Sequence, residues 1–344
     1  MINTKKQSVL VTGGSGYLSG WMMVDLLKRG HDVRATLRRP EAEDAVRAAV
    51  GSQHVSTDRL TFKIADLLGD AGWDDALDGC DAVMHVASPM GQGQGRHVDL
   101  VTPAREGTLR VLRAAGRSGV KQVIVTSSAV AAQPRNLAAE PVPADDETVW
   151  TDITLKETSR YARSKVIAER SAWDFVHAEA KNFTLTTILP GMILGPVMRD
   201  SVSGSVELIG RMLSGRMPAI PRVGFSIVDV RDLVNLHILA LESKNAADQR
   251  FLAVSDFMWL SDMAACLKDT FGPEASKVST RMLPDFLLRM AAPFREEARF
   301  MAPMIGKEGS LSSRKAKEWL DWHPRPASEA VIDCARSLIE RRLT

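Results

Sequence analysis

The sequence is poor in cysteine and shows no excess of either charge. Its three cysteines, Cys80, Cys266 and Cys334, lie far apart and match no spacing typical of a zinc site. We interpret them as small buried residues in a reducing compartment rather than as a disulfide framework. Lysine and arginine number 44 and aspartate and glutamate 42, a net charge of +2. Charge therefore gives no reason to expect a nucleic-acid partner.

Long apolar runs are also missing. No stretch approaches the roughly 20 apolar residues that cross a bilayer. The first residues, MINTKKQ, lead into a strand-like segment without the apolar core of a signal peptide. A cytoplasmic protein without a membrane span is therefore expected. At 344 residues, 45% of them apolar, the chain is long enough for one large domain and a smaller one.

The first half of the chain alternates apolar, strand-like runs with helix-like segments. The expected strands are Ser8–Thr12, Asp32–Leu37, Leu60–Ile64, Ala82–Val86, Gln122–Thr126 and Phe183–Leu189. The expected helices lie near Gly20–Lys28, Glu41–Val50, Asp74–Leu77, Pro103–Ala115 and Tyr161–Glu179. Apolar strands separated by crossover helices are typical of a parallel sheet covered on both faces. The pattern predicts an α/β fold with a Rossmann-type, doubly wound parallel sheet.

The second half has a different composition, with frequent glycine, proline and methionine after about residue 190. A helix over Val230–Leu241 and a strand over Arg250–Val254 are expected to return to the sheet. The remainder predicts a smaller, mostly helical lobe that binds the substrate. The expected division is a nucleotide-binding domain at 1–190 with a return segment at about 225–255, and a substrate lobe at 191–224 and 256–344.

A glycine-rich loop lies between the first expected strand and the first expected helix. Gly13 permits a tight turn, and Gly16 lets the backbone approach a pyrophosphate at the helix N-terminus. Ser19 stands where a third small residue allows the helix and strand to pack closely, with Gly20 beside it. An ordinary glycine-rich turn is the alternative, but the position between strand and helix favours dinucleotide binding.

The end of the second strand indicates which dinucleotide binds. Arg38 and Arg39 stand there without an acidic residue. An arginine suits the 2′-phosphate of NADP, whereas an acid would bind the ribose hydroxyl of NAD. Asp32 comes too early in the strand to reach the ribose. A solvated basic loop, neutralised by Glu41 and Glu43, is the alternative, but the pattern favours NADP(H).

Tyr161 and Lys165 lie four residues apart in an expected helix, so their side chains share one face. A phenol ordinarily has a pKa of about 10, and a nearby positive charge favours its ionised form. The spacing therefore suits a tyrosine that exchanges protons near neutral pH. Many helices carry the same pair on a solvated surface, but the glycine loop and the arginines favour a role for Tyr161 and Lys165 in proton transfer.

Two more residues lie in or just after expected strands. Asp66 comes after the third strand, where a doubly wound fold places an adenine edge; outside that fold it would be a plain turn aspartate. His85 lies in the apolar fourth strand, and we interpret it as a hydrogen-bonded core histidine rather than a catalytic one.

These motifs together resemble the extended short-chain dehydrogenase/reductases. The closest likeness is to dihydroflavonol reductases, cinnamoyl-CoA reductases and related microbial NADPH aldehyde/ketone reductases. The resemblance rests on VTGGSGYL at 11–18, VRATLR at 33–38, ADL at 65–67, HVASPM at 85–90, TSSA at 126–129, the Tyr161/Lys165 pair and PGMILGP at 190–196. These segments cover roughly the first 200 residues in the expected order. Beyond them only 225–233 is similar.

The resemblance implies hydride transfer from NADPH to an aldehyde or ketone, and it assigns roles to residues of this chain. Ser128 matches the catalytic serine, Tyr161 the general acid, and Lys165 its partner, which also holds the nicotinamide ribose. Cofactor contacts are expected at Thr12, Gly13, Ser15, Gly16, Tyr17, Leu18, Arg38, Arg39, Asp66, Leu67, Val86, Ala87, Ser88, Lys165, Pro190, Met192 and Ile193. Substrate contacts are expected at Ser88, Met90, Ser128, Gln133 and Tyr161, and no metal is expected.

Some positions depart from the family pattern, and others do not decide which residues form the substrate pocket. Ser19 and Gly20 reverse the usual order, and Gln133 stands where plant flavonoid reductases place a polar substrate contact. Methionines of the second half suit either the core or an adaptable pocket for an apolar or aromatic carbonyl. These are Met198, Met212, Met217, Met301 and Met304.

The resemblance also implies a homodimer formed through the helices near 103–115 and 161–179, although monomers occur among such reductases. Three other functions share these motifs. They are a nucleotide-sugar epimerase or dehydratase, a hydroxysteroid-type dehydrogenase, and a regulator that binds NADP(H) without chemistry. Arg38 and Arg39 argue against the first, and the retained serine, tyrosine and lysine argue against the last.

Overall fold

The structure of this protein is a computed structural model that describes residues 6–89, 99–133, 146–156, 158–179, 182–200, 204–309 and 311–344. Met90, an expected substrate contact, lies outside the described residues. No helix among those ranges is long and apolar enough to cross a membrane.

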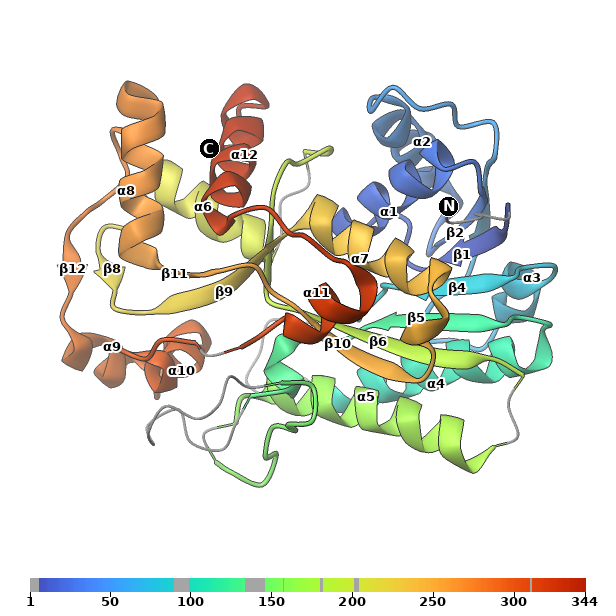
Figure 1. The fold of residues 1–344 in the computed structure, drawn as a ribbon. Coiled ribbons are helices and arrows are strands. Elements are labelled where there is room, and N and C mark those ends of the chain that lie inside the picture. The colour runs from blue at the N-terminus through green and yellow to red at the C-terminus, as the bar shows by residue number, and fades with distance from the viewer. Residues whose placement is uncertain are drawn as a thin grey trace.

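Seven parallel strands form the main sheet, in the order β10-β6-β5-β4-β1-β2-β3 (Figure 1). They are β1 Ser8–Val11, β2 Asp32–Leu37, β3 Leu60–Ile64, β4 Ala82–His85, β5 Gln122–Thr126, β6 Thr184–Pro190 and β10 Gln249–Ala253. The strand order reverses between β1 and β4, which creates a crevice at the carboxyl ends of these strands. The predicted doubly wound parallel sheet is confirmed.

Helices cover both faces of this sheet because its strands are apolar on both sides. Val9 and Val11 pack toward the first core cluster and Leu10 toward the other. One face holds α1 Tyr17–Lys28, α2 Glu43–Gly51 and α7 Val230–Glu242, and the opposite face holds α3 Trp73–Leu77, α4 Val101–Arg117 and α5 Arg160–Ala178.

A second lobe lies beyond the carboxyl edge of the sheet (Figure 1). Its three-stranded sheet has the order β11-β9-β7, with β7 Met192–Leu194, β9 Gly224–Asp229 and β11 Phe257–Trp259. A two-stranded pair joins β8 Ile220–Pro221 to β12 Met282–Leu283. Its helices are α6 Ser205–Leu213, α8 Leu260–Phe271, α9 Asp285–Ala291, α10 Glu296–Met301 and α12 Ala327–Glu340. Short 3-10 turns are η1 Pro40–Ala42, η2 Ala129–Ala131, η3 Lys244–Ala246, η4 Gly272–Ala275 and η5 Ala302–Met304.

The two lobes exchange segments more than the sequence suggests. Within the expected return segment, β9 pairs with β7 and β11, while α7 and β10 rejoin the main sheet. Near the C-terminus, α11 Arg314–Leu320 also packs on the main-sheet side. The buried Trp322 follows it and donates to the carbonyl of Asp232 at 2.8 Å. The expected substrate lobe at 256–344 therefore does not include this part, because its apolar side chains fill the core beside α7.

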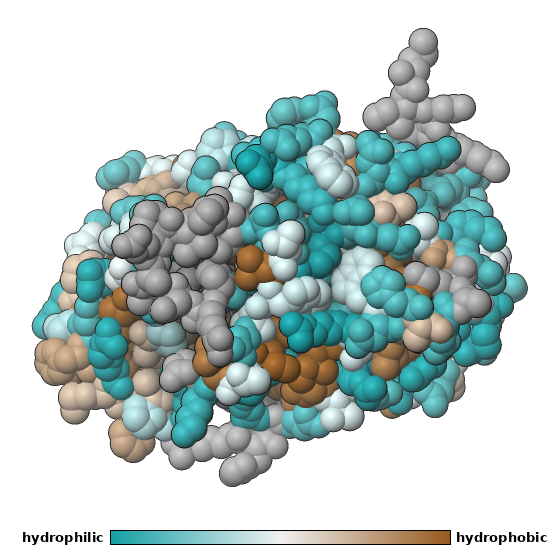
Figure 2. All heavy atoms as spheres, turned by 60° about the horizontal axis from the view of Figure 1, so that its bottom comes forward, coloured by the Kyte–Doolittle hydropathy of each residue, from teal (hydrophilic) through white to brown (hydrophobic). Residues whose placement is uncertain are grey.

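Apolar side chains are exposed mainly around α9. Phe286 is 59% exposed and Met290 66%. Figure 2 shows apolar side chains at the left end of the molecule, where Figure 1 places α9, and further apolar side chains near the middle of that face among hydrophilic ones. In α9 the side chain of Leu288 is buried, and Ala291 also packs against the core of this lobe.

Candidate active site

The glycine loop is held in a tight turn at the start of α1. Gly13 has a φ of +68°, and a Cβ there would lie 2.9 Å from the Cβ of Ala87. Ser19 Oγ donates to the carbonyls of Gly13 at 2.6 Å and Gly16 at 3.0 Å. The turn thus brings the free backbone N–H groups at the beginning of a 12-residue helix to one side of a pocket.

The reversed Ser19-Gly20 order has a packing reason. Gly20 approaches Met198, whose Cε would lie 2.7 Å from a Cβ on residue 20. Trp21 Nε1 donates to the carbonyl of Pro196 at 2.9 Å. Ser19 therefore stabilises the turn through its hydrogen bonds, and Gly20 leaves space for the segment that follows β7.

A pocket of about 410 Å³, here called the nucleotide pocket, lies along the carboxyl ends of β1 to β4. Eleven of the expected cofactor residues line it: Gly13, Ser15, Gly16, Tyr17, Leu18, Arg38, Asp66, Leu67, Val86, Ala87 and Ser88. The sequence reasoning missed Ser19, Thr36, Ala65, Leu68, Trp73 and Pro89, which also line it. Thr36 had a readable signal, since it precedes Arg38 by two residues and so shares its side of the strand.

Other expected cofactor residues lie elsewhere. Thr12 is fully buried, and its Oγ1 accepts from the backbone N–H of Ala87 at 3.0 Å and is hydrogen-bonded to His85 Nδ1 at 2.9 Å. Thr12 thus supports the pocket wall rather than facing it. Arg39 and Ile193 are not among the described residues that line the pocket; Arg39 is exposed, and Ile193 packs against the main core.

Helix α5 presents the tyrosine and lysine in its first two turns. Ser159 caps the helix by accepting from the N–H of Ala162 at 3.1 Å. Lys165 Nζ lies 5.8 Å from the ring centroid of Tyr161 and donates to Ser88 Oγ at 3.3 Å. Because Ser88 lines the nucleotide pocket, this contact joins the Tyr161 helix to that pocket.

Ser128 stands where β5 ends and η2 begins, and it is 7% exposed. Its Oγ accepts from the N–H of Val130 at 3.4 Å. Ser128 and Tyr161 line the same cavity, together with the expected residues Gln133, Pro190 and Met192. The structure therefore brings together residues that lie more than 30 positions apart in the sequence.

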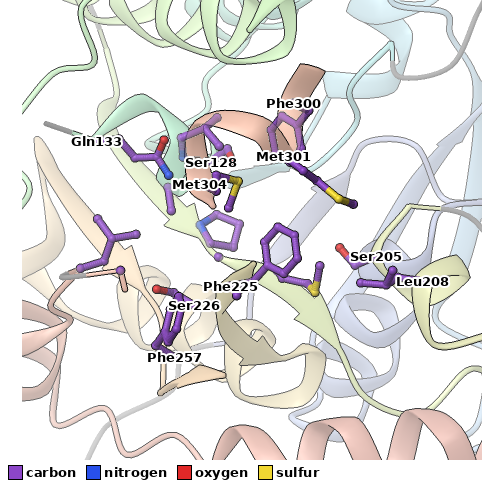
Figure 3. A pocket seen from close by; sticks show the side chains of 18 of the residues that line it. Ser128, Gln133, Ser205, Leu208, Phe225, Ser226, Phe257, Phe300, Met301 and Met304 are labelled. Atoms are coloured by element: carbon purple, nitrogen blue, oxygen red, sulfur yellow. Dashed lines mark hydrogen bonds between the residues drawn. The ribbon is translucent and has the colours of Figure 1, made fainter. Parts of the chain in front are cut away.

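This substrate cavity has a volume of about 360 Å³ and is mostly walled by apolar side chains (Figure 3). Phe225 and Phe257 come from the small sheet, and Phe300, Met301 and Met304 from α10 and η5. Of the five methionines that suited either core or pocket, only these last two line the cavity. Met198, Met212 and Met217 are buried in the cores.

A family model described as the NAD dependent epimerase/dehydratase family matches residues 9–253, which is more than half of the chain. The chain belongs to this family. The resemblance to extended short-chain dehydrogenase/reductases drawn from the motifs is confirmed by this match.

Similar proteins of this epimerase/dehydratase family include cinnamoyl-CoA reductases. One from Medicago truncatula is 35% identical over 248 residues, which cover 71% of this chain and 75% of that protein. One from Oryza sativa subsp. japonica is 33% identical over 271 residues, covering 78% and 77%. A crystal structure of the yeast methylglyoxal/isovaleraldehyde reductase complexed with NADPH has a TM-score of 0.79 at 21% identity, over 97% of this chain and 99% of that one. The last likeness shows the fold alone.

The lining of the substrate cavity in this family member also includes charged groups that sequence reasoning did not single out. Arg211 and Glu297 form an ion pair of 2.9 Å, and Glu207, Lys307 and Glu308 also line the cavity. No local sequence signal marks them, because α6, α10 and the residues after η5 meet only in the folded chain.

His85 behaves as a core residue. It is 2% exposed, and burial first, with the charge of Lys165 second, lowers its pKa to about 3. The imidazole is therefore neutral at neutral pH and fixed by Thr12. The interpretation of His85 as a hydrogen-bonded core histidine is confirmed.

Proposed function

We propose that this protein is an NADP(H)-dependent carbonyl reductase that converts an aldehyde or ketone with an apolar or aromatic substituent into an alcohol. One observation carries the proposal: Tyr161 and Ser128 open into one apolar cavity, while Lys165, one turn after Tyr161, contacts the nucleotide pocket. A proton donor and a hydride source can thus act on the same carbonyl. The names of the similar cinnamoyl-CoA reductases support this activity.

The nucleotide pocket fits NADP(H). Its glycine turn leaves no room for a Cβ at Gly13, as expected where a backbone must approach a pyrophosphate. Arg38 and Thr36 line the pocket, and the guanidinium of Arg38 suits a 2′-phosphate. Asp66 also lines it and would hold the adenine edge. Bound NADPH supplies the hydride for the carbonyl carbon.

The residues of the chain supply the proton and orient the carbonyl. Tyr161 donates its phenolic proton to the carbonyl oxygen as the carbon receives hydride, so the product is a neutral alcohol. Ser128 donates a hydrogen bond to the same oxygen and stabilises its developing negative charge. Lys165 provides positive charge beside Tyr161 and a donor for the nicotinamide ribose. The same steps in reverse oxidise the alcohol.

The two lobes divide these tasks. The main sheet with α1 to α5, α7 and α11 binds the dinucleotide, and the second lobe closes the substrate cavity with Phe225, Phe257 and Met301. We also infer a homodimer through α4 and α5, which pack against each other on one face of the sheet (Figure 1). A mass measurement by light scattering on the purified protein separates the dimer from the monomeric alternative.

The activity is tested by following NADPH absorbance with aldehydes, α-diketones, β-ketoesters and aryl ketones. Oxidation of NADPH with apolar or aryl carbonyls is expected, and Tyr161→Phe is the matched control that keeps the fold. Failure with every carbonyl, together with a nicotinamide that co-purifies, would instead favour the epimerase or dehydratase function.

A further inference from the structure

A buried carboxylate lies on the helix that carries the proposed proton donor. Glu169 follows Tyr161 and Lys165 at the same four-residue spacing, so the three side chains form one stripe on α5. The Glu169 side chain is 1% exposed. Its carboxylate accepts from Ser127 Oγ at 2.6 Å and Thr187 Oγ1 at 2.8 Å. Burying a charge this deeply is costly, and here hydrogen bonds and an opposite charge offset that cost.

The opposite charge is Arg250 on β10. Its Nε lies 2.8 Å from Oε1 of Glu169, and its guanidinium carbon lies 3.7 Å from the ring centroid of Trp150. It also donates to the carbonyls of Glu147 and Val149. Its second terminal nitrogen is buried without a hydrogen-bond partner among the described residues. Arg250 thus fixes α5 to β10 and to the segment that precedes α5.

This ion pair lies directly behind the proposed site. Ser127, a donor to the carboxylate, is followed by Ser128, whose side chain opens into the substrate cavity. The segment held by Arg250 continues to Thr151, which donates to the carbonyl of Val130 at 2.6 Å and accepts from the N–H of Gln133 at 2.9 Å. One pair therefore connects the helix of the proton donor with the strand end that carries the serine.

The pair also sets the charge next to Lys165. Lys165 and Glu169 line one small cavity of about 20 Å³, which is room for about one water molecule. His85 lines the same cavity and is neutral, since its pKa is lowered to about 3, chiefly by burial. The carboxylate of Glu169 is therefore the anion that faces Lys165 among the residues described there. Arg250 contacts Oε1 of that carboxylate and is not among the described residues that line the small cavity.

Other charged groups lie on the Arg250 side of the ion pair. Glu147 accepts from the N–H of Leu252 at 2.8 Å, and burial raises its pKa. Lys315 lies beyond it, and burial is the main cause that lowers its pKa. Asp146 precedes Glu147 and accepts from Thr148.

We infer that Glu169 and Arg250 are positioning residues for the carbonyl reduction. Together they hold Tyr161 and Ser128 in their relative positions and balance the charge beside Lys165. The inference rests on the proposed function, because it concerns the proton that Tyr161 donates. It goes further in stating how two residues outside both pockets govern that step.

Glu169 and Arg250 carry opposite charges, so removing one or the other should shift the pH at which reduction declines in opposite directions. Glu169→Gln leaves the positive charge of Arg250 uncompensated, which favours the ionised phenolate, so reduction declines at a lower pH. Arg250→Met leaves the negative charge of Glu169 uncompensated, so reduction declines at a higher pH. The double variant removes both charges, so the midpoint of the pH profile of kcat returns toward that of the wild type. A purely structural role moves both single variants in the same direction or not at all.

The experiment measures the pH profile of kcat for an aldehyde that the wild-type protein reduces, with NADPH affinity followed by fluorescence titration. We expect kcat to fall about tenfold to a hundredfold in each single variant, with NADPH affinity within about threefold of wild type. The midpoint is expected to shift by about half a pH unit or more, downward for Glu169→Gln and upward for Arg250→Met.

Matched variants separate positioning from general damage. Arg250→Lys keeps the charge, so the midpoint should return to the wild-type value while kcat stays reduced. Thr187→Val removes one hydrogen bond to Glu169 without a change of charge and should lower kcat without moving the midpoint. Asp232→Asn breaks another partly buried ion pair, with Arg325, that lines neither pocket; it should lower stability only.

Two results would overturn the inference: midpoints that do not move apart, or single variants with wild-type kcat. If a single variant does not fold, Arg250→Lys and Thr187→Val decide the matter, since wild-type kcat in both excludes a positioning role. Absence of carbonyl reduction by the wild-type protein would contradict the proposed function itself, which is a distinguishable outcome.

Discussion

The nucleotide pocket and the substrate cavity lie at the same carboxyl edge of the sheet but are built from different parts of the chain. Residues at and after the carboxyl ends of β1, β2, β3 and β4 line the nucleotide pocket, among them the glycine turn at Gly13 and Gly16. Side chains from β6, β7, β9, β11, α6 and α10 wall the substrate cavity. A backbone turn holds one ligand shape, whereas flexible apolar side chains repack around many. The first region therefore fixes the cofactor, and the second is where specificity can change.

The largest loss of activity is expected at Tyr161, which lines the substrate cavity on the helix that also contacts the nucleotide pocket through Lys165. Tyr161→Phe removes the proton donor but keeps the ring, so kcat should fall by about a thousandfold. NADPH affinity should stay near that of the wild type, because the nucleotide pocket is untouched. Steady-state kinetics measures kcat, and a fluorescence titration measures NADPH affinity. An active Tyr161→Phe protein would disprove the assignment.

Acid should destabilise the folded protein in part through His85, which supports the wall of the nucleotide pocket. His85 has a folded pKa of about 3 because of burial, below the ordinary value near 6.5. The unfolded state therefore binds the proton first, and the stability that neutral His85 contributes above about pH 6.5 is lost progressively toward about pH 3. For His85 the loss between about pH 7 and pH 5 is about 2 kcal/mol.

Urea unfolding at several pH values measures this loss. His85→Gln, which keeps a polar partner for Thr12, should flatten the dependence of unfolding free energy on pH. The exposed His323 provides the control, since His323→Gln should leave the slope unchanged. An unchanged slope in His85→Gln would show that His85 is not the group responsible.

Cofactor choice is the next test of the nucleotide pocket. Arg38→Ala removes the donor proposed for the 2′-phosphate, so the KM for NADPH should rise about tenfold to a hundredfold. The KM for NADH should change little, because that cofactor has no 2′-phosphate. Arg39→Ala is the matched control, since Arg39 does not line the pocket among the described residues. Equal effects on both cofactors would argue against this role for Arg38.

The smallest effects are expected in the adaptable cavity. Met301→Ala enlarges it and removes one apolar contact, so KM for an aryl ketone should rise only a few-fold. Bulkier ketones should be affected less or improved. Met212→Ala, at a buried core position, is the control: it should lower thermal stability without changing the substrate preference. A uniform loss of activity in Met301→Ala would show that the cavity is not adaptable.

The pattern of the first half predicted its elements closely because its strands are short runs rich in apolar residues, separated by polar and glycine-containing segments. Helix α1 starts at Tyr17 rather than near Gly20, since the turn at Gly13 and Gly16 brings the chain directly into the helix. The split of the segment near 225–255 could not be predicted. Both β9 and β10 are apolar, and nothing local tells which sheet either will join.

The same contrast holds within the site. Tyr161, Lys165 and Arg38 are recognisable because their chemistry depends on spacing along one helix or on the end of one strand. Phe257 and Met304 are unremarkable apolar residues in the sequence, and only the packing of the second lobe makes them walls of a cavity.

The sequence by itself determined the sheet, the glycine turn and the family, because these depend on local periodicity and on short contiguous motifs. Tertiary structure alone decided the shape of the substrate cavity and the burial of Glu169 against Arg250, 81 positions later in the chain. The physical reason is distance along the chain. Backbone geometry is set by neighbouring residues, whereas a cavity wall or a buried ion pair exists only after remote elements pack together.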